Sequence, residues 1–442
     1  MVTIAHLADA HLGFRQYGLP ERASDFAKSF HRAVDEIVER RADIDLVLIV
    51  GDLFHSKRPS PETIREAVIG LKKLREANIP VIVTRGNHDA PYSQGSNNVL
   101  TLLSELGLVK YIDYGRVEIS GIEIIACGCT PTAYTRALEN YLRQVVSLEK
   151  GQRILLLHQV IEGIEQNYPN DPYVVPLDVV KEFATKFNYI ALGHVHTFAL
   201  KHPQLPAYYS GSLDIWDISE FETYIMKSSK TLVKERDMSE KGFLIVHVDG
   251  GIEVERVRLR PSRRMIRAVL AYSNEVKPSE VMRDLISVAH ELDREDAVVV
   301  IELLGNLVPG SSRHELNLKE VRKYFRRVLK LDIRNRLGVV TSTTDGKVVD
   351  ISSLSLESLL RSSFLKYFSN VAKSIALDPQ FLSELAMKLL DLLAQGKTRE
   401  ALYVLYRELG VDTGTVSIPS ISTSTSAPSR RGRESTILDW LR

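Results

Sequence analysis

Side chains that can bind metal ions follow five short apolar runs in the first half of the chain. The five clusters are Asp9-Ala10-His11, Gly51-Asp52-Leu53-Phe54-His55, Gly86-Asn87-His88-Asp89, His158 and Gly193-His194-Val195-His196. A mixture of carboxylate, imidazole and amide oxygen suits manganese, iron or zinc better than calcium or a thiolate-bound zinc. Seven ligand residues are too many for one ion, so we expect two ions that share a carboxylate, the usual clamp for phosphate displacement.

The spacing within the clusters carries further expectations. In an extended chain, side chains two residues apart point to the same side, so Asp9 with His11, and His194 with His196, are expected to meet at one centre. His6 has the opposite parity and is assigned to packing. Glycines precede Asp52, Asn87 and His194, where they allow a sharp bend at the end of a strand. A lone histidine such as His158 is usually a core residue, and only its place in the ordered set makes it a candidate ligand.

The elements that must position these clusters are predicted to be strands of an α/β fold. The five apolar runs are Thr3–Leu7, Ile44–Val50, Val81–Thr84, Ile154–Leu157 and Tyr189–Leu192, each short enough for a buried strand. Between the second and third runs, apolar residues recur at helical spacing from Ile64 to Leu74. Strand–helix–strand units of this kind indicate a layered α/β fold, whose ligand site lies outside the carboxyl ends of the strands.

The rest of the chain divides into smaller parts. We place the end of the first domain at residue 261, after a hairpin turn at 249–251. Residues 262–350 are expected to form a small α+β unit, with strands at MIRAVLAY and AVVVIELLG and helices at PSEVMRDLISVAHELD and LKEVRKYFRRVLKL. Residues 351–410 predict two amphipathic helices, one from Leu356 to Phe368 and a second that starts near Pro379 and carries Leu382 to Leu392. Residues 411–442 form a Ser/Thr-rich tail that we expect to be disordered.

Composition favours a globular protein of the reducing cytoplasm. The chain has 442 residues, 44% hydrophobic and 26% charged, with a net charge of +1. No global field therefore favours nucleic acid, and any basic surface must be local. Cys127 and Cys129 are expected to be small buried thiols rather than a disulfide or a zinc site. We find no run of about 20 apolar residues and no leader pattern, so we expect a cytoplasmic protein without a membrane contact.

The ordered motifs DxH, GDxxH, GNHD, a lone His and GHxH resemble those of calcineurin-like metallophosphoesterases over residues 1 to 235. The resemblance implies that Asp9, His11, Asp52 and His196 hold one metal ion. It implies that Asp52, Asn87, His158 and His194 hold the other, with Asp52 bridging. It further implies that His88 protonates the leaving oxygen, that His55 lies beside the phosphate, and that Asp89 orients a neighbouring imidazole.

Longer segments resemble one branch of this superfamily, the double-strand-break repair nucleases of the meiotic recombination 11 family, called SbcD in bacteria. They are AHLADAHLG, GDLFHSKRPSPETI, TRGNHD, LGHVH and YYSGSLD. The resemblance, in its archaeal form, implies a four-layer α/β/β/α sandwich, then an α+β capping domain and a C-terminal helical pair. It implies two Mn²⁺ ions, 3′-to-5′ exonuclease activity on duplex ends, endonuclease activity on single-stranded DNA, and a coiled-coil zinc-hook ATPase as partner. It also implies a homodimer, for which we expect contacts through Leu100 and Leu103.

Two other functions remain open from the residues. The same metal pair could serve a small-molecule phosphodiesterase or phosphatase, because the metal site does not name the substrate. The chain could also be mainly a structural subunit that binds DNA ends and positions them for the ATPase.

A local basic run supports a nucleic-acid partner. From Arg313 to Arg336 there are nine lysines or arginines and three acids, a net charge of +6. Phosphate backbones bind to such patches, and Arg322, Lys323, Arg326 and Arg327 are the candidate contacts. The alternative is an ordinary solvated helix face.

Two further partner sites are candidates. The helices of 355–409 could pack only on each other, yet they are better explained as a docking site for a coiled coil. Near the C-terminus, Glu434, Ile437, Trp440 and Leu441 resemble the sliding-clamp-binding peptide, although Gln and a second aromatic residue are usual where Glu434 and Leu441 stand. The alternative for this peptide is a terminal helical turn that docks on its own domain.

Overall fold

The computed structural model describes residues 2–93, 96–146, 151–164, 171–227, 230–249, 251–339, 364–365, 367–368, 378–394 and 398–408. The chain divides into two compact units, residues 1–341 and 342–442. The first unit contains all of the predicted metal-binding residues.

The first sheet of unit 1 carries three of the five predicted strands. Its order is β16 (Ile252–Leu259), β15 (Lys241–Val248), β1 (Val2–Leu7), β2 (Leu46–Val50), β3 (Val81–Thr84) and β4 (Lys110–Tyr111). Strands β1, β2 and β3 run parallel, so their carboxyl ends meet at one edge. β15 and β16 pair antiparallel as the hairpin predicted around 249–251.

Helices α1 (Pro20–Glu39), α2 (Pro61–Glu76) and α3 (Val99–Glu105) cover the outer face of this sheet. Proline at the first helical position begins both α1 and α2, and the side chain of Ser60 caps α2 by accepting a hydrogen bond from the Thr63 amide. The helix predicted from the spacing between Ile64 and Leu74 is therefore confirmed as α2.

The second sheet carries the other two predicted strands. Its order is β11 (Leu200–Lys201), β12 (Ala207–Tyr209), β10 (Tyr189–Gly193), β7 (Gln152–His158), β6 (Ile122–Cys127) and β5 (Tyr114–Ile119). β7 and β10 are parallel, and His158 lies opposite Gly193. Helices α4 (Thr135–Val146) and α5 (Leu177–Ala184) cover the outer face of this sheet.

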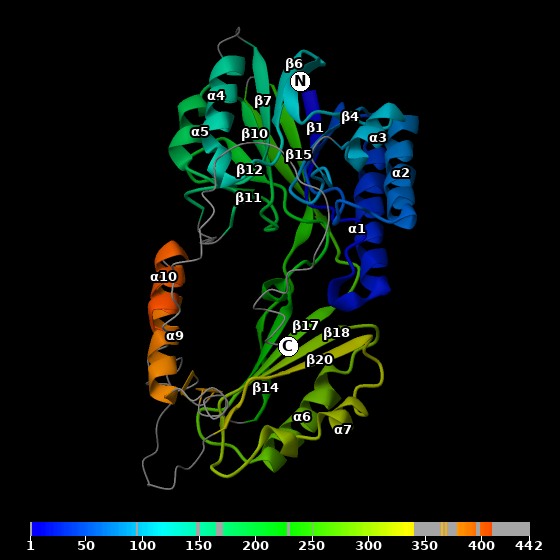
Figure 1. Cartoon of the computed structure of the whole chain (residues 1–442). Coiled ribbons are helices and arrows are strands. Elements are labelled where there is room, and N and C mark those ends of the chain that lie inside the picture. The colour runs from blue at the N-terminus through cyan, green and yellow to red at the C-terminus, as the bar shows by residue number, and fades with distance from the viewer. Residues whose placement is uncertain are drawn as a thin grey trace. The chain divides into compact units, whose positions relative to one another are not determined.

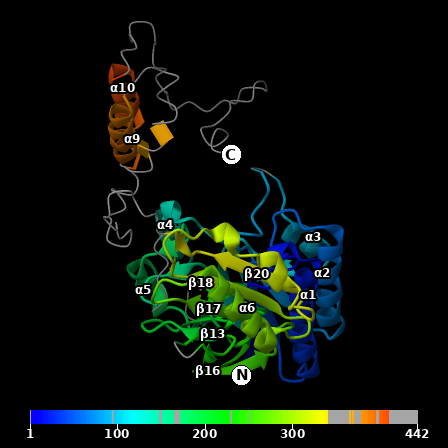
Figure 2. The ribbon, with the colours of Figure 1, turned by 90° about the horizontal axis from the view of Figure 1, so that it is seen from below.

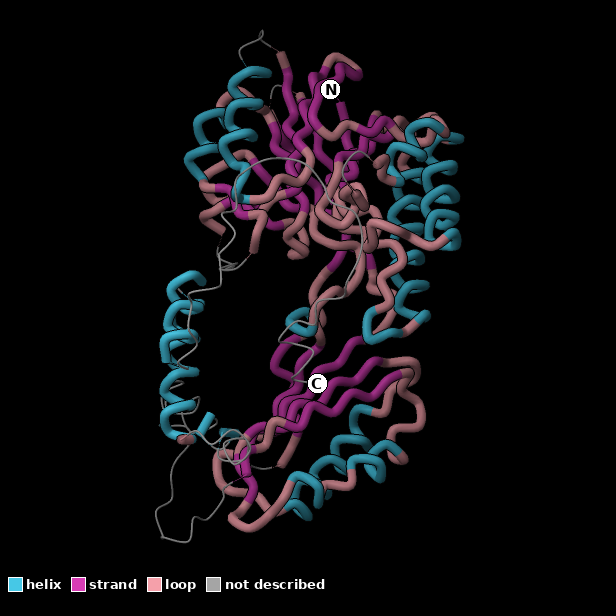
Figure 3. The backbone as a smooth tube through the Cα atoms, viewed as in Figure 1, coloured by secondary structure: helices cyan, strands magenta, loops and turns pink. Residues whose placement is uncertain are grey.

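The two sheets pack face to face through a core of aliphatic residues that includes Ile4, Leu48 and Ile82 from the first sheet and Ile124 and Leu156 from the second. Figure 3 shows the strands in the middle and the helices on both outer sides. The predicted α/β/β/α sandwich is confirmed. It brings the carboxyl ends of β1, β2 and β3 opposite those of β7 and β10.

A third sheet has the order β14 (Leu232–Arg236), β13 (Glu222–Met226), β17 (Met265–Ala271), β18 (Val298–Leu304) and β20 (Lys330–Asn335). Helices α6 (Pro278–Leu292) and α7 (Leu318–Arg322) pack on one face of it (Figures 1 and 2). β13 and β14 precede residue 261, so this sheet draws on both sides of the predicted domain boundary, which stays a prediction. The helix expected over 318–331 was too long: α7 ends at Arg322, and Lys330 already belongs to β20.

The described residues of unit 1 also contain two short strand pairs and four 3-10 helices. β8 (Val160–Ile161) pairs with β9 (Val174–Val175), and β19 (Asn306–Leu307) pairs with β21 (Gly338–Val339). The 3-10 helices are η1 (Gln16–Gly18), η2 (Thr132–Tyr134), η3 (Ile218–Glu220) and η4 (Arg313–Glu315).

In unit 2 the structure describes α9 (Pro379–Ala394) and α10 (Thr398–Glu408). Helix α9 starts at Pro379 as predicted, but the segment from there to residue 409 forms two helices rather than one. The helix expected between Leu356 and Phe368 lies largely outside the described residues, and so does the tail 411–442.

Two smaller predictions are also decided by burial. Cys127 and Cys129 are buried free thiols, as expected. Leu100 and Leu103 of α3 are fully buried in the core, so the expectation that they make dimer contacts was wrong; Leu102 and Leu106 are the exposed leucines there. None of the helices in the described residues has the length and apolar character needed to cross a bilayer.

Candidate metal centre

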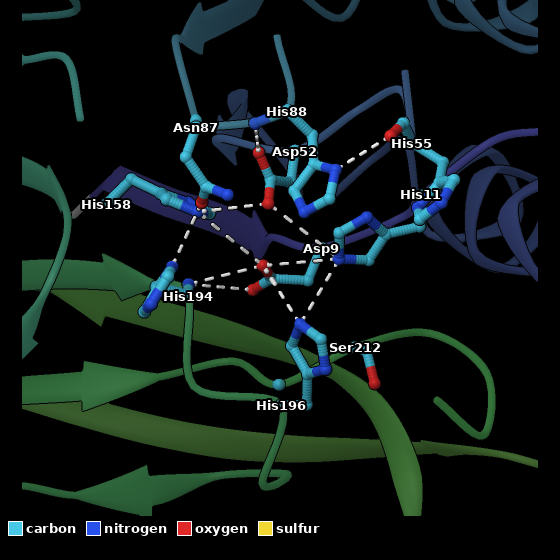
Figure 4. A network of polar contacts seen from close by, with 12 residues as sticks. Asp9, His11, Asp52, His55, Asn87, His88, His158, His194, His196 and Ser212 are labelled. Carbon is cyan, nitrogen blue, oxygen red and sulfur yellow. Dashed lines mark hydrogen bonds and ion pairs between the residues drawn. The ribbon is translucent and has the colours of Figure 1, made fainter. Parts of the chain in front are cut away.

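The carboxyl ends of β1, β2, β3, β7 and β10, with the loops that follow them, bring all seven predicted metal-binding residues into one cluster (Figure 4). One group of side chains lies around His11. Its Nε2 atom is 3.2 Å from Nε2 of His196 and 3.9 Å from Oδ1 of Asp9. Nε2 of His196 is 3.6 Å from the same Asp9 oxygen. These are three of the four residues that the resemblance assigns to one ion.

The second group lies around His158 and His194. Nδ1 of His194 is 3.1 Å from Oδ1 of Asn87, and the rings of His158 and His194 are 5.2 Å apart. Asp52 lies between the groups: its Oδ2 atom is 3.3 Å from Nε2 of His158 and 3.8 Å from Nε2 of His11. A carboxylate that contacts both groups has the placement required of a bridge.

A backbone conformation with positive φ, rather than an extended chain, orients several of these side chains. Asp9, His11, Asp52 and His194 all have positive φ, at 52°, 45°, 52° and 84°. Such conformations cost about 1–3 kcal/mol each and occur where surrounding structure enforces them, often at functional sites. The amides of Asp9 and His11 donate to the carbonyls of Gly51 and Asp52 and hold the two loops together.

We expected these side chains to meet because side chains alternate along an extended chain, and that reason was wrong. Asp9 and His11 meet, but they do so through left-handed turns beyond the end of β1. His194 and His196 belong to different groups, His194 with Asn87 and His196 with His11.

Close approach explains all three glycines that precede Asp52, Asn87 and His194, and a Cβ atom on Gly193 would lie 2.1 Å from the carbonyl oxygen of Val50. A Cβ atom on Gly86 would lie 2.0 Å from Oδ1 of Asp52, and one on Gly51 would lie 2.1 Å from Nδ1 of His158. Gly51 also has a φ of +80°, so the bend expected there is present. At Gly86 the reason is space for the Asp52 carboxylate.

The donor set fits a divalent cation. Nδ1 of His158 is 2.8 Å from the carbonyl oxygen of Val50, which can only accept, so Nδ1 carries the hydrogen. The other nitrogen, Nε2, is buried, has no hydrogen-bond partner among the described residues, and faces the Asp52 carboxylate. Two acceptors that face each other need a cation or a proton between them.

The electrostatics of the cluster agree with this requirement. Burial lowers the pKa of His158, but the carboxylates of Asp52 and Asp9 outweigh it and raise the pKa to about 9. Burial also holds the pKa of His11 well below its usual value, with His196, His88 and His55 adding to the effect against the opposing Asp52 carboxylate. A neutral His11 keeps a lone pair available to a metal ion. His6, by contrast, bonds to the Tyr189 hydroxyl, and burial lowers its pKa to about 3, in line with a packing role.

His88 and His55 lie beside the cluster. The His88 amide donates to Oδ1 of Asp52 at 2.9 Å, and Nδ1 of the ring donates to the carbonyl of His55 at 2.7 Å. Nε2 of His88 is thus the ring nitrogen left for a substrate. The His55 ring stacks between Phe14 and His88, at 4.2 and 5.0 Å, and burial followed by repulsion from His88 lowers the pKa of His55 to about 4.

The role expected for Asp89 needs correction. Its carboxylate accepts hydrogen bonds from the amides of Leu53, Phe54 and Gly86, and in the described residues no imidazole bonds to it. Burial and the neighbouring Asp52 carboxylate raise the pKa of Asp89 to about 7. Asp89 therefore fastens the β2 loop to the β3 loop, and it acts on the cluster through the backbone.

Sequence reasoning missed several residues of the cavity, about 910 Å³ in volume, that opens onto the cluster. Trp216 lines it and stacks on His11, with ring centroids 4.0 Å apart. Asp171 lines it as well and contacts His194. Lys241 is buried at its base, where it bonds to the His196 carbonyl and to Glu220. None of the three belongs to a local motif.

A second cavity of about 500 Å³ adjoins the cluster and shares Asn87 and His88 with the first. Its basic lining residues are Lys57 and Arg58, both exposed, and the Arg58 guanidinium lies over the ring of Tyr92.

Acidic side chains neutralise part of the positive charge of the basic run 313–336. Arg322, Lys323, Arg326 and Arg327 are exposed, as a nucleic-acid contact requires. Lys323 pairs with Glu320, however, and Arg327 lies 3.8 Å from Glu295. Acids outside the run supply further partners, because Glu302 contacts Arg334 and Arg336. The net charge of +6, which counts only the acids within the run, therefore overstates the positive charge of this surface.

The clamp-like residues Glu434, Ile437, Trp440 and Leu441 lie outside the described residues.

Comparison with known proteins agrees with the geometry. Residues 2–198 match the calcineurin-like phosphoesterase family. The protein named DNA double-strand break repair protein Mre11 from Methanococcus maripaludis is 34% identical over 267 residues, which cover 57% of this chain and 65% of that protein. Its namesake from Methanocaldococcus jannaschii is 37% identical over 234 residues, covering 50% and 58%. The one from Thermoplasma acidophilum is 29% identical over 315 residues, covering 68% and 77%. The chain thus spans less than two thirds of the first two relatives.

Proposed function

We propose that the chain is a manganese-dependent nuclease that processes DNA double-strand breaks, because residues 2–198 match the calcineurin-like phosphoesterase family. One observation carries the proposal. Seven candidate ligands from five strand ends gather in one cluster, with the Asp52 carboxylate in contact with both halves of it.

Two ions would be held by these residues. Asp9, His11, Asp52 and His196 would hold one, and Asp52, Asn87, His158 and His194 the other. Carboxylate, imidazole and amide donors suit Mn²⁺. When bound, such a pair supplies Lewis-acid stabilisation of charge on the phosphate and activates water.

The chain itself supplies proton transfer. His88 is a candidate general acid, since its Nε2 atom can give a proton to the departing sugar oxygen. The His55 carbonyl accepts from Nδ1 of His88 and so stabilises the protonated ring. The bond from the His88 amide to Asp52 keeps this ring next to the metal-binding groups. The His55 ring, neutral at physiological pH, forms an uncharged wall for the phosphate.

DNA is the substrate that the surroundings and the relatives favour. The printed names of the archaeal relatives refer to DNA double-strand break repair. Lys57 and Arg58 line the cavity next to His88, where a flanking backbone phosphate can bind. Arg322 and Arg326 on the third-sheet unit are exposed cations at which duplex DNA can bind. We include 3′-to-5′ exonuclease activity on duplex ends and endonuclease activity on single strands in the proposal.

The proposal extends to partners. Helices α9 and α10 expose Leu390, Leu393, Leu402 and Tyr403, apolar side chains suited to a coiled-coil zinc-hook ATPase. Leu102 and Leu106 of α3 are exposed and could contact a second copy of the chain in a homodimer. The clamp-like peptide at 434–441 remains a candidate for binding the sliding clamp.

A nuclease assay tests the function. Duplex and single-stranded DNA labelled at one end are incubated with Mn²⁺, Mg²⁺ or a chelator, alongside the small ester bis-p-nitrophenyl phosphate. We expect Mn²⁺-dependent cleavage of DNA that is lost with chelator and in Asp52→Ala. Rapid turnover of the small ester with no cleavage of DNA would favour the small-molecule enzyme instead. DNA-end binding that survives Asp52→Ala, without cleavage by the wild type, would favour the structural role.

A further inference from the structure

We propose that Asp171 is a positioning residue for His194, and that it makes the metal position formed by Asn87, His158 and His194 the tighter of the two. The inference rests on the proposed metal pair but not on the identity of the substrate. Asp171 stands in no motif, and residues 165–170 before it are outside the described part of the chain.

The contacts of His194 determine which of its nitrogens carries the hydrogen. Nε2 is 2.8 Å from Oδ2 of Asp171, and Nδ1 is 3.1 Å from Oδ1 of Asn87. A neutral imidazole has one N–H, and the carboxylate is the stronger acceptor. Nε2 therefore donates to Asp171, and the Nδ1 lone pair faces the Asn87 oxygen. As at His158 and Asp52, two acceptors face each other where a cation would bind.

Asp171 is itself held in place. Its Oδ1 atom accepts a hydrogen bond from the Tyr173 amide at 2.8 Å. The next carbonyl, that of Pro172, accepts from the amide and the hydroxyl of Thr132 at 2.7 and 2.8 Å. Strand β9 then pairs with β8, and the ring of Tyr173 packs edge-on against His194 at 5.5 Å. The carboxylate is therefore fixed before an ion binds.

Among the described residues, no carboxylate supports another histidine of the cluster in this way. His158 uses its second nitrogen on the neutral carbonyl of Val50, and Nδ1 of His11 is buried without a partner in the described residues. A carboxylate on the remote nitrogen orients an imidazole and raises its basicity as a ligand, and loss of such a partner weakens metal binding by roughly 10- to 100-fold. The His194 side of the cluster has this support and the His11 side does not.

Stepwise Mn²⁺ titration by calorimetry tests the inference. Asp171→Asn keeps the shape of the side chain and an oxygen for the Tyr173 amide, so the fold is preserved while the charge is lost. We expect two Mn²⁺ steps in the wild type. In Asp171→Asn the tighter step should weaken by about 10- to 100-fold and the other should keep its affinity.

His196→Ala isolates the position, because it removes a ligand from the opposite side of the cluster. In that background one Mn²⁺ step should remain, and Asp171→Asn should weaken it by the same factor. Asp217→Asn is the matched control. Asp217 lines the same cavity but bonds to the Ser219 amide rather than to a histidine, so its loss removes a charge without releasing a ligand.

Each outcome decides one claim. Weakening confined to Asp171→Asn supports the positioning role. Unchanged affinity in Asp171→Asn, or equal weakening in Asp217→Asn, overturns it. A wild type that binds no pair of Mn²⁺ ions would instead reject the metal pair of the proposed function.

Discussion

Replacing Arg22 with methionine should destabilise unit 1 strongly, because this guanidinium is fully buried between two buried carboxylates. It donates to Oδ2 of Asp25 at 2.8 Å and to Oδ1 of Asp214 at 2.9 Å. It also donates to Oε1 of Gln16, whose amide in turn donates to the carbonyl of Trp216. Since Trp216 stacks on His11, the same network supports the candidate metal centre.

The two carboxylates differ in the contacts that remain to them in Arg22→Met. Asp25 keeps a cation, because Arg263 contacts both of its oxygens at 2.7 and 3.1 Å. Asp214 keeps only the dipoles of Ser29, Ile215 and Ser262, and no other cation contacts it in the described residues. An uncompensated buried charge costs about 3–5 kcal/mol. We therefore expect Arg22→Met to lower the free energy of unfolding by about 4 kcal/mol.

Urea unfolding measures this loss. The chain has two tryptophans, so Trp440→Phe leaves Trp216 as the single reporter of unit 1. The matched control is Arg40→Met, since Arg40 pairs with Glu36 and Glu255 at the surface, where such pairs contribute about 0–1 kcal/mol. Adding Asp214→Asn to Arg22→Met should restore part of the loss, because it removes the stranded charge. Equal losses for Arg22→Met and Arg40→Met would refute the reasoning.

Three more predictions follow from the same contacts. His88→Leu should leave Mn²⁺ binding intact and lower DNA cleavage by about 100- to 10,000-fold in a single-turnover assay, and unchanged turnover would remove His88 from the mechanism. Burial raises the pKa of Glu222, but bonds led by that from Arg264 outweigh it and lower the pKa to about 2, against a usual 4.5. Stability gained from this group is thus present above about pH 4.5 and lost as the pH falls towards 2, and Glu222→Gln should flatten that part of the unfolding curve. Reversing Arg326 and Arg327 to glutamate should weaken DNA binding in a salt-dependent way but not hydrolysis of the small ester; equal loss of both would exclude a DNA role there.

The sequence was informative about the strand ends because their signals are local. A buried strand needs a run of apolar residues, and polar residues directly after it must lie at the sheet edge. Strands β1, β2, β3, β7 and β10 and the cluster at their ends could therefore be predicted, and the structure brings that cluster together. The orientation of these side chains was not determined locally. The positive φ at Asp9 and Asp52 depends on hydrogen bonds between loops of different strands.

Several predictions went wrong where remote residues decide the outcome. The net charge of +6 for 313–336 included only the acids of that run, whereas Glu295 and Glu302 contact it from other elements, and its role in DNA binding stays a prediction. Helix α7 ends at Arg322, and residues from Lys330 to Asn335 pair with β18 instead of continuing the expected helix. Asp89 bonds to loop amides that the sequence does not place beside it.

The residue types, their order and their position at strand ends were thus determined by the sequence alone, because hydrophobic periodicity and short motifs act over a few residues. Which side chains lie in contact within the cluster, which carboxylate bonds to which imidazole, and which buried charges are neutralised were decided only by the tertiary structure. Asp171 with His194 and Arg22 with Asp214 illustrate the reason: electrostatic pairs form by distance in space, and chain separations of 23 and 192 residues conceal that distance from the sequence.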